Sequence, residues 1–398
     1  MKILVLNSGS SSIKCQYFID QKSIASVSVE RIGEGESKSQ INYHGNKASY
    51  TSFVPDHHEA LNTILSLLKK SNILTSINEL NAVGHRVVHG GEAFKEPTLV
   101  NEKVIQTIKS LIPLAPLHNP ANLEGIEVLY NRYPNLPQIA VFDTAFHQSM
   151  PQHAYLYPIP YELSQSSSIR RYGFHGTSHA YVAKEAAKIL NKDLNEVNLI
   201  TLHLGNGASI TAIREGQSID TSMGMTPLEG LMMGTRSGDI DPAIIPYLAQ
   251  NNKMDIESID KMLNKESGLK GICGTNDMRE VIEHTEQHDK LSTLALKMYT
   301  YRIKKYIGAY TVALGHVDAI IFTGGIGEHA GKVREMVCKG LYESIGVDID
   351  TEKNNISSSE CLELQSEKSR IKLFVIPTNE ELEIVLQTET LLSAKASA

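Results

Sequence analysis

The sequence predicts an α/β fold built from two similar halves, and three observations carry that prediction. Residues 3–6 form a short apolar run that passes through a glycine- and serine-rich turn into an alternating return strand from residue 13. This is the pattern of a hairpin whose first strand is buried on both faces. Residues 199–213 repeat the design with Gly205-Asn206-Gly207 at the turn, and a spacing of about 200 residues indicates two related half-molecules. A third apolar run, residues 319–323, leads into a glycine-rich turn at residues 324–328.

The first half alternates strands with helices, which is typical of an α/β domain. After the hairpin we expect a polar strand region, a helix, a strand, a second helix and a buried strand, at residues 40–54, 58–70, 81–88, from 119 onward and 138–142. Asn119 is a natural N-cap and Pro120 suits the first helical position, so His118 should lie just before that helix.

The second half begins with a connector to residue 168 that is rich in proline, tyrosine and serine. The second hairpin, a long loop over residues 224–241, helices through residue 317, a strand at 371–376 and a helix capped by Asn379 should follow. Residues 291–314 carry too many apolar and tyrosine positions for a single stripe. This indicates burial on more than one side or a subunit contact.

Composition excludes several function classes. The 398 residues are 41% hydrophobic with a net charge of -7, which is enough chain for two domains and leaves no basic face for general nucleic-acid binding. No apolar run approaches the ~20 residues of a membrane span. The four cysteines have neither CxxC spacing nor the density of a disulfide scaffold, so we expect a cytoplasmic protein.

Several residues have the chemistry of an anion site. The first turn can offer backbone N–H groups and hydroxyls to phosphate oxygens, with Lys14 as a nearby charge, and a helix expected from about residue 331 would present its N-terminus to an anion. Arg86 and Arg236 lie beside glycines, and a guanidinium orients carboxylates and phosphates in a bidentate manner. Asp143 ends a buried strand, where open α/β sheets place their chemistry.

Two histidine pairs have i, i+4 spacing, which raises the question of a zinc site. They are His85 with His89 and His175 with His179. Neither pair has the glutamate of a metalloprotease helix between its members, and residues 172–178 do not read as a helix interior. Zinc is therefore not favoured.

An ordered set of motifs identifies a family resemblance. They read GHRVVHGG at residues 84–91, PLHNP at 116–120, VFDTAFH at 141–147, RYGFHGTSH at 171–179, GTRSGD at 234–239 and PTNEEL at 377–382. With the two hairpins and the third turn they resemble the acetate kinase family of the acetate and sugar kinase, heat-shock protein and actin superfamily. The resemblance implies two similar ribonuclease H-like domains with a nucleotide cleft between them. It places one domain at residues 1–149 plus 382–398 and the other at 150–381, with a homodimer formed through the second.

The resemblance also implies an activity, the reversible transfer of the ATP γ-phosphoryl group to acetate to give acetyl phosphate and ADP. Mg²⁺ is the implied metal, with Mn²⁺ as a substitute, and the implied catalytic residues are Arg86, His118, Asp143, His175 and Arg236. Arg86 also binds acetate, and the acetate methyl pocket is formed by Val88, Leu117, Phe174 and Pro227. Asn7 and Glu380 are implied to hold the metal. Nucleotide contacts are implied for Lys14, His203, Leu204, Gly205, Asn206, Gly207, Asp277, Met278, Arg279, Gly324, Gly325, Ile326, Gly327 and Glu328.

Two points qualify this assignment. Residues 274–277 depart from the family's usual serine-rich pattern. Acetate, with a pKa of roughly 4 to 5, is already ionised at pH 7, so we expect Asp143 to orient Arg86, the metal or the attacking oxygen instead of removing a proton.

The sequence leaves three alternatives to compare with this function. A propionate or butyrate kinase would differ in pocket size alone, and Val88 favours acetate. A non-enzymatic nucleotide switch of the actin type would lack the arginine and histidine set. Residues 325–330 followed by Asp348 satisfy a dinucleotide fingerprint, but too little chain follows for that fold.

Overall fold

The computed structural model describes residues 1–356, 358 and 360–396, and the chain forms two compact units. Unit 1 comprises Met1–Phe146 and Asn379–Ala398, and unit 2 comprises His147–Thr378. The chain passes from unit 1 to unit 2 after Phe146 and returns after Thr378; both points lie slightly before the domain boundaries that the resemblance implied. The ring of His147 bonds Ser218 of unit 2, and Asn379 caps the helix that returns to unit 1.

Unit 1 is built on one mixed sheet of eight strands in the order β5-β4-β3-β2-β1-β6-β8-β7. Its strands are β1 (Lys2–Gly9), β2 (Ser12–Ile19), β3 (Lys22–Glu30), β4 (Ser37–Tyr43), β5 (Asn46–Ser52), β6 (Ala82–Val87), β7 (Thr98–Leu99) and β8 (Gln138–Phe142). Strands β1, β6 and β8 are parallel, so their carboxyl ends share one edge.

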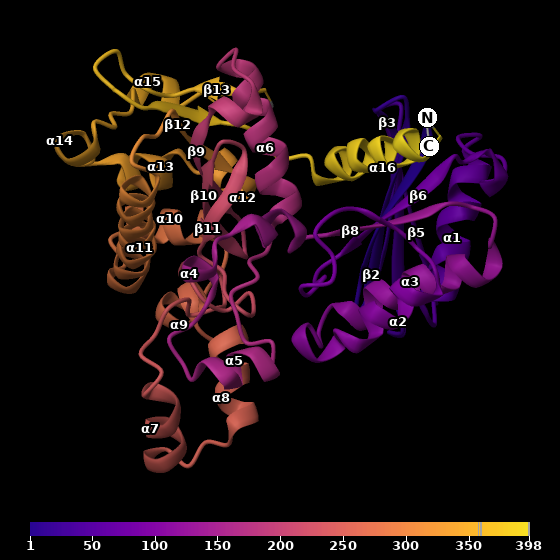
Figure 1. The fold of residues 1–398 in the computed structure, drawn as a ribbon, viewed down its shortest axis with the longest axis horizontal. Coiled ribbons are helices and arrows are strands. Elements are labelled where there is room, and N and C mark those ends of the chain that lie inside the picture. The colour runs from indigo at the N-terminus through magenta and orange to yellow at the C-terminus, as the bar shows by residue number, and fades with distance from the viewer. Residues whose placement is uncertain (357, 359, 397–398) are drawn as a thin grey trace. The chain divides into compact units, whose positions relative to one another are not determined.

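Helices cover both faces of this sheet. They are α1 (His57–Lys70), α2 (Glu102–Ser110), α3 (Asn119–Arg132) and α16 (Glu380–Ala396). Side chains alternate along a strand: Leu4 and Leu6 of β1 join the core under α1, whereas Ile3 and Val5 pack with Ile384 of α16. The C-terminal helix α16, yellow in Figure 1, packs against strands of this sheet.

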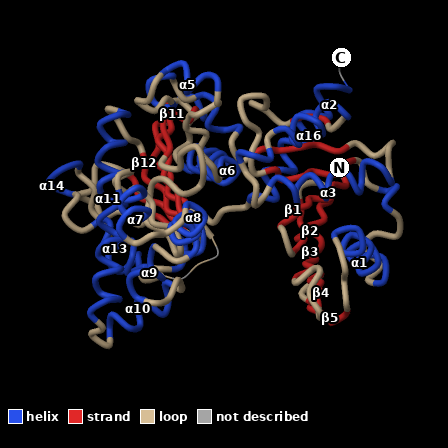
Figure 2. Tube along the Cα trace, turned by 90° about the horizontal axis from the view of Figure 1, so that it is seen from below, coloured by secondary structure: helices blue, strands red, loops and turns tan. Residues whose placement is uncertain are grey.

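Unit 2 is built on a sheet of six strands in the order β11-β10-β9-β12-β14-β13. Its strands are β9 (Asn198–Leu204), β10 (Ala208–Arg214), β11 (Gln217–Thr221), β12 (Ala319–Thr323), β13 (Leu362–Glu363) and β14 (Lys372–Val375). Helix α6 lies on one face and α11 on the other (Figures 1 and 2).

The helices of unit 2 are more numerous. They are α4 (Gln152–Tyr155), α5 (Tyr161–Ser166), α6 (Gly176–Ile189), α7 (Ile244–Asn251), α8 (Ile256–Lys265), α9 (Gly268–Cys273), α10 (Met278–Glu286), α11 (Lys290–Leu314), α12 (Gly324–His329), α13 (Gly331–Cys338), α14 (Tyr342–Ile345) and α15 (Thr351–Asn354). No helix in the described part of the chain is long and apolar enough to cross a membrane.

The two sheets confirm the prediction of two related halves. In unit 1 an antiparallel meander β1-β2-β3 continues into the parallel strands β6 and β8, and in unit 2 the meander β9-β10-β11 continues into β12 and β14. Both predicted hairpins are present.

Three local expectations were wrong. Asn119 is the first residue of α3 and His118 is the cap position, because the Asn119 amide bonds the backbone of His89 instead. The glycine-rich turn after β12 is itself helical and forms α12 from Gly324, whereas the helix expected from about residue 331 is confirmed as α13. Helices α4, α5 and α6 occupy a segment that was expected to be a connector followed directly by the second hairpin.

Candidate functional site

The carboxyl edge of the unit 1 sheet carries the predicted charged residues. Arg86 lies near the end of β6, and Asp143 follows β8 directly. Arg86 donates from Nε and Nη2 to Oδ2 of Asp143, at 3.0 and 2.7 Å. The Asp143 side chain is 1% exposed and that of Arg86 is 22% exposed. Burial opposes the charged guanidinium, but Asp143 and Glu380 outweigh it and hold the pKa of Arg86 above its usual value.

The start of α16 adds carboxylates to this edge. Asn379 accepts a hydrogen bond from the backbone of Leu382, which confirms the predicted cap. Glu380 then lies 3.7 Å from Nε of Arg86. Burial, together with neighbouring Glu380, raises the pKa of Glu381.

A small cavity lies beside this cluster. It has a volume of about 170 Å³, and Asn7, Lys14 and Glu381 contribute to its lining. Asn7 of β1 faces Lys14 of β2 across the hairpin, so the structure brings the predicted metal-binding asparagine and nucleotide-binding lysine together.

Two asparagines of α3 organise the same edge and were missed as site residues. Asn122 accepts from the backbone N–H of Val88 at 3.0 Å and donates to the carbonyl of Ser8 at 2.6 Å. Asn119 bonds both backbone groups of His89. These contacts join the end of β1 to the loop after β6, and no local pattern in the sequence announces partners so far away.

The predicted apolar residues of unit 1 differ in exposure. Val88 is buried, whereas Leu117, which precedes the cap residue His118, is 60% exposed. An exposed leucine at a helix start has little packing role, so Leu117 is available to contact a ligand.

In unit 2 the predicted histidine lies at the start of a helix. His175 precedes α6 with φ of 55°, a left-handed conformation that few non-glycine residues adopt. Its Nδ1 lies 3.0 Å from the hydroxyl of Ser209. Its ring stacks on that of His203 at 4.2 Å.

His179 has a different role from His175. Its two ring nitrogens lie 2.7 Å from the hydroxyls of Thr201 and Ser209. Burial lowers its pKa well below the usual value, so His179 is a neutral group that supports Ser209, the residue it shares with His175.

Arg236 and His175 converge on the turn of the second hairpin. A Cβ placed on Gly207 would lie 3.4 Å from Nη1 of Arg236 and 3.5 Å from Nε2 of His175. The hydrogen bonds that Arg236 makes to described residues go to neutral groups, the carbonyl of Pro227 at 3.4 Å and the sulfur of Met233 at 3.7 Å. Burial lowers the pKa of Arg236, and within the described residues no carboxylate forms an ion pair with it.

A cavity of about 460 Å³ in unit 2 joins the three predicted nucleotide segments. Its lining includes Gly205, Asn206, Asp277, Met278, Arg279, Gly325 and Ile326, all of which were predicted. Asn276, Ile282, His329 and Ala330 also line it and were missed. Asn276 could have been found, because it lies beside the predicted Asp277 and donates to Asn206.

Other predicted nucleotide residues have local partners. Asp277 caps α10 and pairs with Arg279, and these hydrogen bonds lower the pKa of Asp277 to about 2. Glu328 turns inward, where it accepts from the backbone N–H groups of Gly324 at 2.9 Å and Thr378 at 3.1 Å. The structure therefore gives Glu328 a structural role in shaping the turn.

The predicted site residues divide between the two units. Those of unit 1 are Asn7, Lys14, Arg86, Val88, Leu117, His118, Asp143 and Glu380, and those of unit 2 are Phe174, His175, His203, Leu204, Gly205, Asn206, Gly207, Pro227, Arg236, Asp277, Met278, Arg279, Gly324, Gly325, Ile326, Gly327 and Glu328. The first set combines charges and apolar groups around a carboxylate-paired arginine. The second combines Arg236, which has no carboxylate partner in the described part of the chain, with a histidine and a cavity of about 460 Å³.

Comparisons with known proteins agree with this chemistry. The profile of the Acetokinase family matches residues 2–386. A protein from Sulfurovum sp. described as "Acetate kinase" is 65% identical over 99% of both chains. The crystal structure of Porphyromonas gingivalis acetate kinase is 42% identical, covers 98% of this chain and 99% of its own, and superposes with a TM-score of 0.94. That of a propionate kinase from Francisella tularensis is 44% identical, covers 97% and 98%, and has a TM-score of 0.91.

Proposed function

We propose that this chain, which belongs to the acetokinase family, is an acetate kinase that transfers the γ-phosphoryl group of ATP to acetate. The observation that supports this most directly is Arg236, a partly buried guanidinium with neutral neighbours and without a carboxylate partner in the described residues. A cation in that state is poised for an anion. The anion that suits it is a phosphoryl group, because His175 approaches the same turn and the 460 Å³ cavity adjoins that turn at Gly205 and Asn206.

The reaction is an in-line displacement. A carboxylate oxygen of acetate attacks the γ-phosphorus and forms the new O–P bond, while the bond between that phosphorus and the β–γ bridging oxygen breaks and ADP leaves. Little covalent work falls to the protein in such a transfer, so its contribution is positioning and charge stabilisation. Arg236 and the ring N–H of His175 stabilise the migrating group.

Arg86 and Asp143 act on the acceptor. Asp143 fixes the guanidinium of Arg86 through two hydrogen bonds to one oxygen, so Arg86 is oriented before substrate binds. The remaining N–H groups of Arg86 hold the acetate carboxylate, and His118 supports the substrates from the start of α3. No proton has to be removed from acetate at neutral pH.

Magnesium is proposed as the metal, with Mn²⁺ able to substitute. The donor set suits it: Asn7 offers an amide oxygen and Glu380 a carboxylate, and Mg²⁺ is usually held by one or two such groups together with waters and substrate phosphates. When bound, the ion neutralises charge on the nucleotide phosphates. Lys14, which faces Asn7, adds a further positive charge for the nucleotide.

Acetate, and not a longer acid, is the proposed substrate. Val88, Leu117, Phe174 and Pro227 receive the methyl group. An apolar pocket rejects one extra methylene by about 1–3 kcal/mol, so propionate should be a poorer substrate that is still used. The similarity to a structure described as a propionate kinase makes propionate the alternative to test.

The test is acyl phosphate formation from ATP, trapped as the hydroxamate, with acetate, propionate and butyrate in parallel. Arg236→Ala should abolish formation, and Arg214→Ala is the matched control, since Arg214 is exposed and bonds the carbonyl of Ala313. A preference for propionate would change the substrate and keep the mechanism. Absence of product with every acid would refute the proposal and favour a nucleotide switch.

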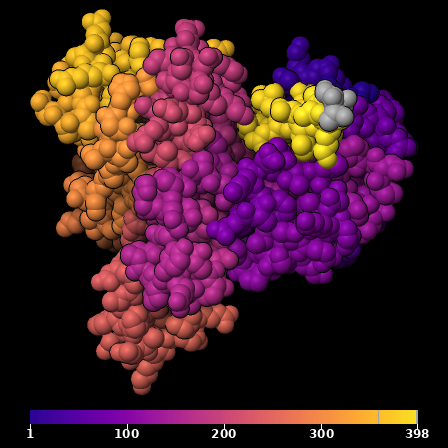
Figure 3. All heavy atoms as spheres, in the orientation of Figure 1, coloured from indigo at the N-terminus to yellow at the C-terminus, as the bar shows by residue number. Residues whose placement is uncertain are grey.

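We also propose a cytoplasmic homodimer formed through unit 2. Helix α7 has no buried residue, and its Tyr247 is 62% exposed; its surface, orange-red, projects from the rest of unit 2 (Figure 3). Helix α11 buries one stripe and leaves Leu294, Tyr301 and Val312 exposed. Apolar surface of this kind marks a protein–protein contact, and sedimentation equilibrium tests it.

A further inference from the structure

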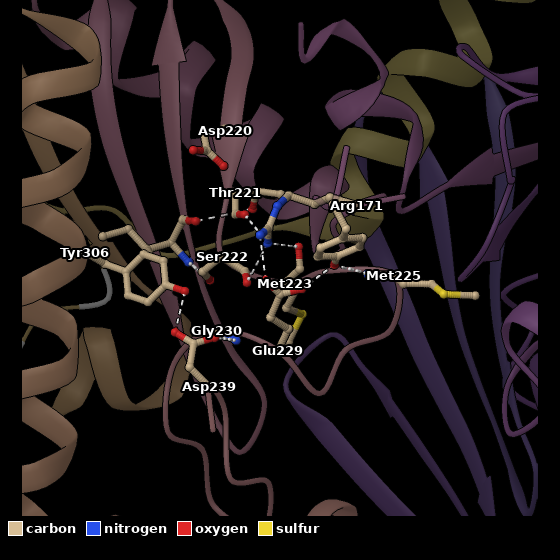
Figure 4. Close-up of polar contacts among 12 residues, drawn as sticks. Arg171, Asp220, Thr221, Ser222, Met223, Met225, Glu229, Gly230, Asp239 and Tyr306 are labelled. Carbon is tan, nitrogen blue, oxygen red and sulfur yellow. Dashed lines mark hydrogen bonds and ion pairs between the residues drawn. The ribbon is translucent and has the colours of Figure 1, made fainter. Parts of the chain in front are cut away.

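A half-buried ion pair closes the loop formed by residues 221–229 of unit 2. Arg171 donates from Nη2 to Oε1 of Glu229 at 2.6 Å, and the two side chains are 15% and 31% exposed. Nη1 of Arg171 donates at 3.0, 3.1 and 3.1 Å to three consecutive carbonyls, those of Thr221, Ser222 and Met223. Figure 4 shows the guanidinium surrounded by these groups. The planar fork of an arginine can serve this many acceptors at once, which a lysine cannot.

A tyrosine closes the loop from the other side. The hydroxyl of Tyr157 donates to Oε2 of Glu229 and accepts from the backbone N–H of Met225 at 3.0 Å. A Cβ on Gly224 would overlap both the Glu229 carboxylate and the Tyr157 hydroxyl, so the loop leaves no spare room. We refer to Arg171, Glu229 and Tyr157 as the clamp.

The clamp joins two parts of the proposed methyl pocket. Arg171 precedes Phe174 in the segment whose Tyr172 and Gly173 donate backbone N–H groups to the carbonyl of Gly224 at 3.0 and 3.2 Å. Pro227 lies in the loop that the clamp encloses. The clamp therefore ties the segment that carries Phe174 to the loop that carries Pro227.

The neighbouring loop, residues 230–239, carries Arg236 and is held by Arg302 and Tyr306 of α11, which we refer to as the anchor. Gly230 and Asp239 bond each other at its neck. From α11, Arg302 donates to the carbonyls of both residues at 2.9 and 3.2 Å, and Tyr306 donates to Oδ2 of Asp239 at 2.7 Å (Figure 4). The two loops meet where Arg236 contacts the Pro227 carbonyl at 3.4 Å.

We propose that the clamp is a positioning device that sets the selectivity for the length of the carboxylic acid, while the anchor on α11 positions Arg236 for phosphoryl transfer. This inference rests on the proposed function, because it assigns Phe174 and Pro227 to the methyl pocket. The structure thus separates acid selectivity and phosphoryl binding into two adjacent loops held by different residues.

Two matched tyrosine substitutions test it. Tyr157→Phe and Tyr306→Phe each remove one hydroxyl that bonds a carboxylate of one loop. In Tyr157→Phe the KM for acetate should rise and the ratio of kcat/KM for acetate over propionate should fall by about threefold to tenfold, within the range one methylene can contribute. The KM for ATP should not change. In Tyr306→Phe, kcat should fall for both acids together and the ratio should stay at the wild-type value.

A second pair of variants keeps the test independent of the tyrosines. Glu229→Ala removes the acceptor of Nη2 of Arg171 and should lower the ratio of kcat/KM for acetate over propionate. Glu229→Gln keeps an oxygen that can accept from Nη2, and its ratio should be close to that of the wild type. Thermal unfolding of each variant reports whether it is folded. A folded Tyr157→Phe whose ratio lies within twofold of the wild type would overturn the proposal, as would an equal change of the ratio in Tyr306→Phe. A wild-type protein that forms no acyl phosphate would instead refute the proposed function.

Discussion

Replacing Asp143 by asparagine separates an orienting role from an acid–base role. The structure gives Asp143 two hydrogen bonds from Arg86, both to Oδ2 and at 3.0 and 2.7 Å. Asparagine has nearly the same shape and keeps an oxygen that can accept, but it removes the negative charge that strengthens these bonds. Arg86 then retains Glu380, 3.7 Å away, as its charged neighbour.

The size of the effect follows from these contacts. Hydrogen bonds to charged groups contribute about 1.5–3 kcal/mol, and loss of that amount in the transition state lowers kcat/KM by roughly 10- to 150-fold. We therefore expect Asp143→Asn to be weakly active, with a raised KM for acetate because Arg86 is less well oriented. An acid–base residue would show a different signature, the loss of one limb of the pH profile.

The assay is hydroxamate trapping with saturating Mg-ATP from pH 5.5 to 8.5, for the wild type and Asp143→Asn. An unchanged profile shape at lower activity is the expected result. Asp318→Asn is the matched control, because Asp318 pairs with Lys192 and is not among the proposed site residues. Disappearance of the acidic limb in Asp143→Asn alone would refute the orienting role.

Three further predictions concern Arg236, a buried histidine and a buried asparagine. Arg236→Met should lower kcat by about a thousandfold or more and raise the free energy of unfolding by about 1 kcal/mol; a less stable Arg236→Met in urea unfolding would contradict this. Burial lowers the pKa of His85 in the folded protein to about 4, whereas an unfolded histidine has a pKa of about 6.5. As the pH falls below about 6.5, His85 therefore takes up a proton in the unfolded state before it does so in the folded state. The free energy of unfolding should decrease by about 3 kcal/mol between about pH 6.5 and 4. His85→Gln should remove that part of the decline in unfolding curves measured at each pH. Asn122→Ala leaves the Val88 N–H and the Ser8 carbonyl without their side-chain partner, and should destabilise the protein by about 2–4 kcal/mol in urea unfolding, with exposed Asn46→Ala as control.

Much of the fold could be predicted because its signals are local. An apolar run of a few residues predicts each of the strands β1, β9 and β12, and all three strands are present. The glycine-rich segments that follow them mark where these strands end, although the one after β12 is helical. The recurrence of the hairpin announced the duplication that the two sheet orders confirm. Part of the lining of the 460 Å³ cavity could also be predicted, because the family resemblance pointed to its three segments at residues 203–207, 277–279 and 324–328.

The remainder depends on contacts between residues far apart in the chain. Asn119 was expected to cap its own helix, but it bonds His89, 30 residues away. The resemblance implied a nucleotide contact for Glu328 and did not announce that its carboxylate accepts from the backbone N–H of Thr378, 50 residues away. Asparagine and glutamate serve equally well as caps, ligands or tertiary acceptors, so residue type alone does not decide among these roles.

The duplicated fold places one arginine of the proposed site in each unit, and the two are held in opposite electrostatic states. Arg86 has Asp143 and Glu380 beside it, and its pKa is raised. Arg236 has neutral neighbours, and burial lowers its pKa. A guanidinium that is already paired with carboxylates is oriented before a further anion arrives, and it binds that anion weakly. These two properties are appropriate for positioning a small, weakly bound acid. A buried guanidinium without a counter-charge lowers the free energy of unfolding, and a bound anion offsets that cost. An interaction raises kcat when it becomes stronger as charge develops on the migrating phosphoryl group. The contrast between the two arginines fits the tasks that we propose for them: Arg86 positions the acceptor, whereas Arg236, which has no carboxylate partner in the described part of the chain, receives its counter-charge from the reacting phosphoryl group.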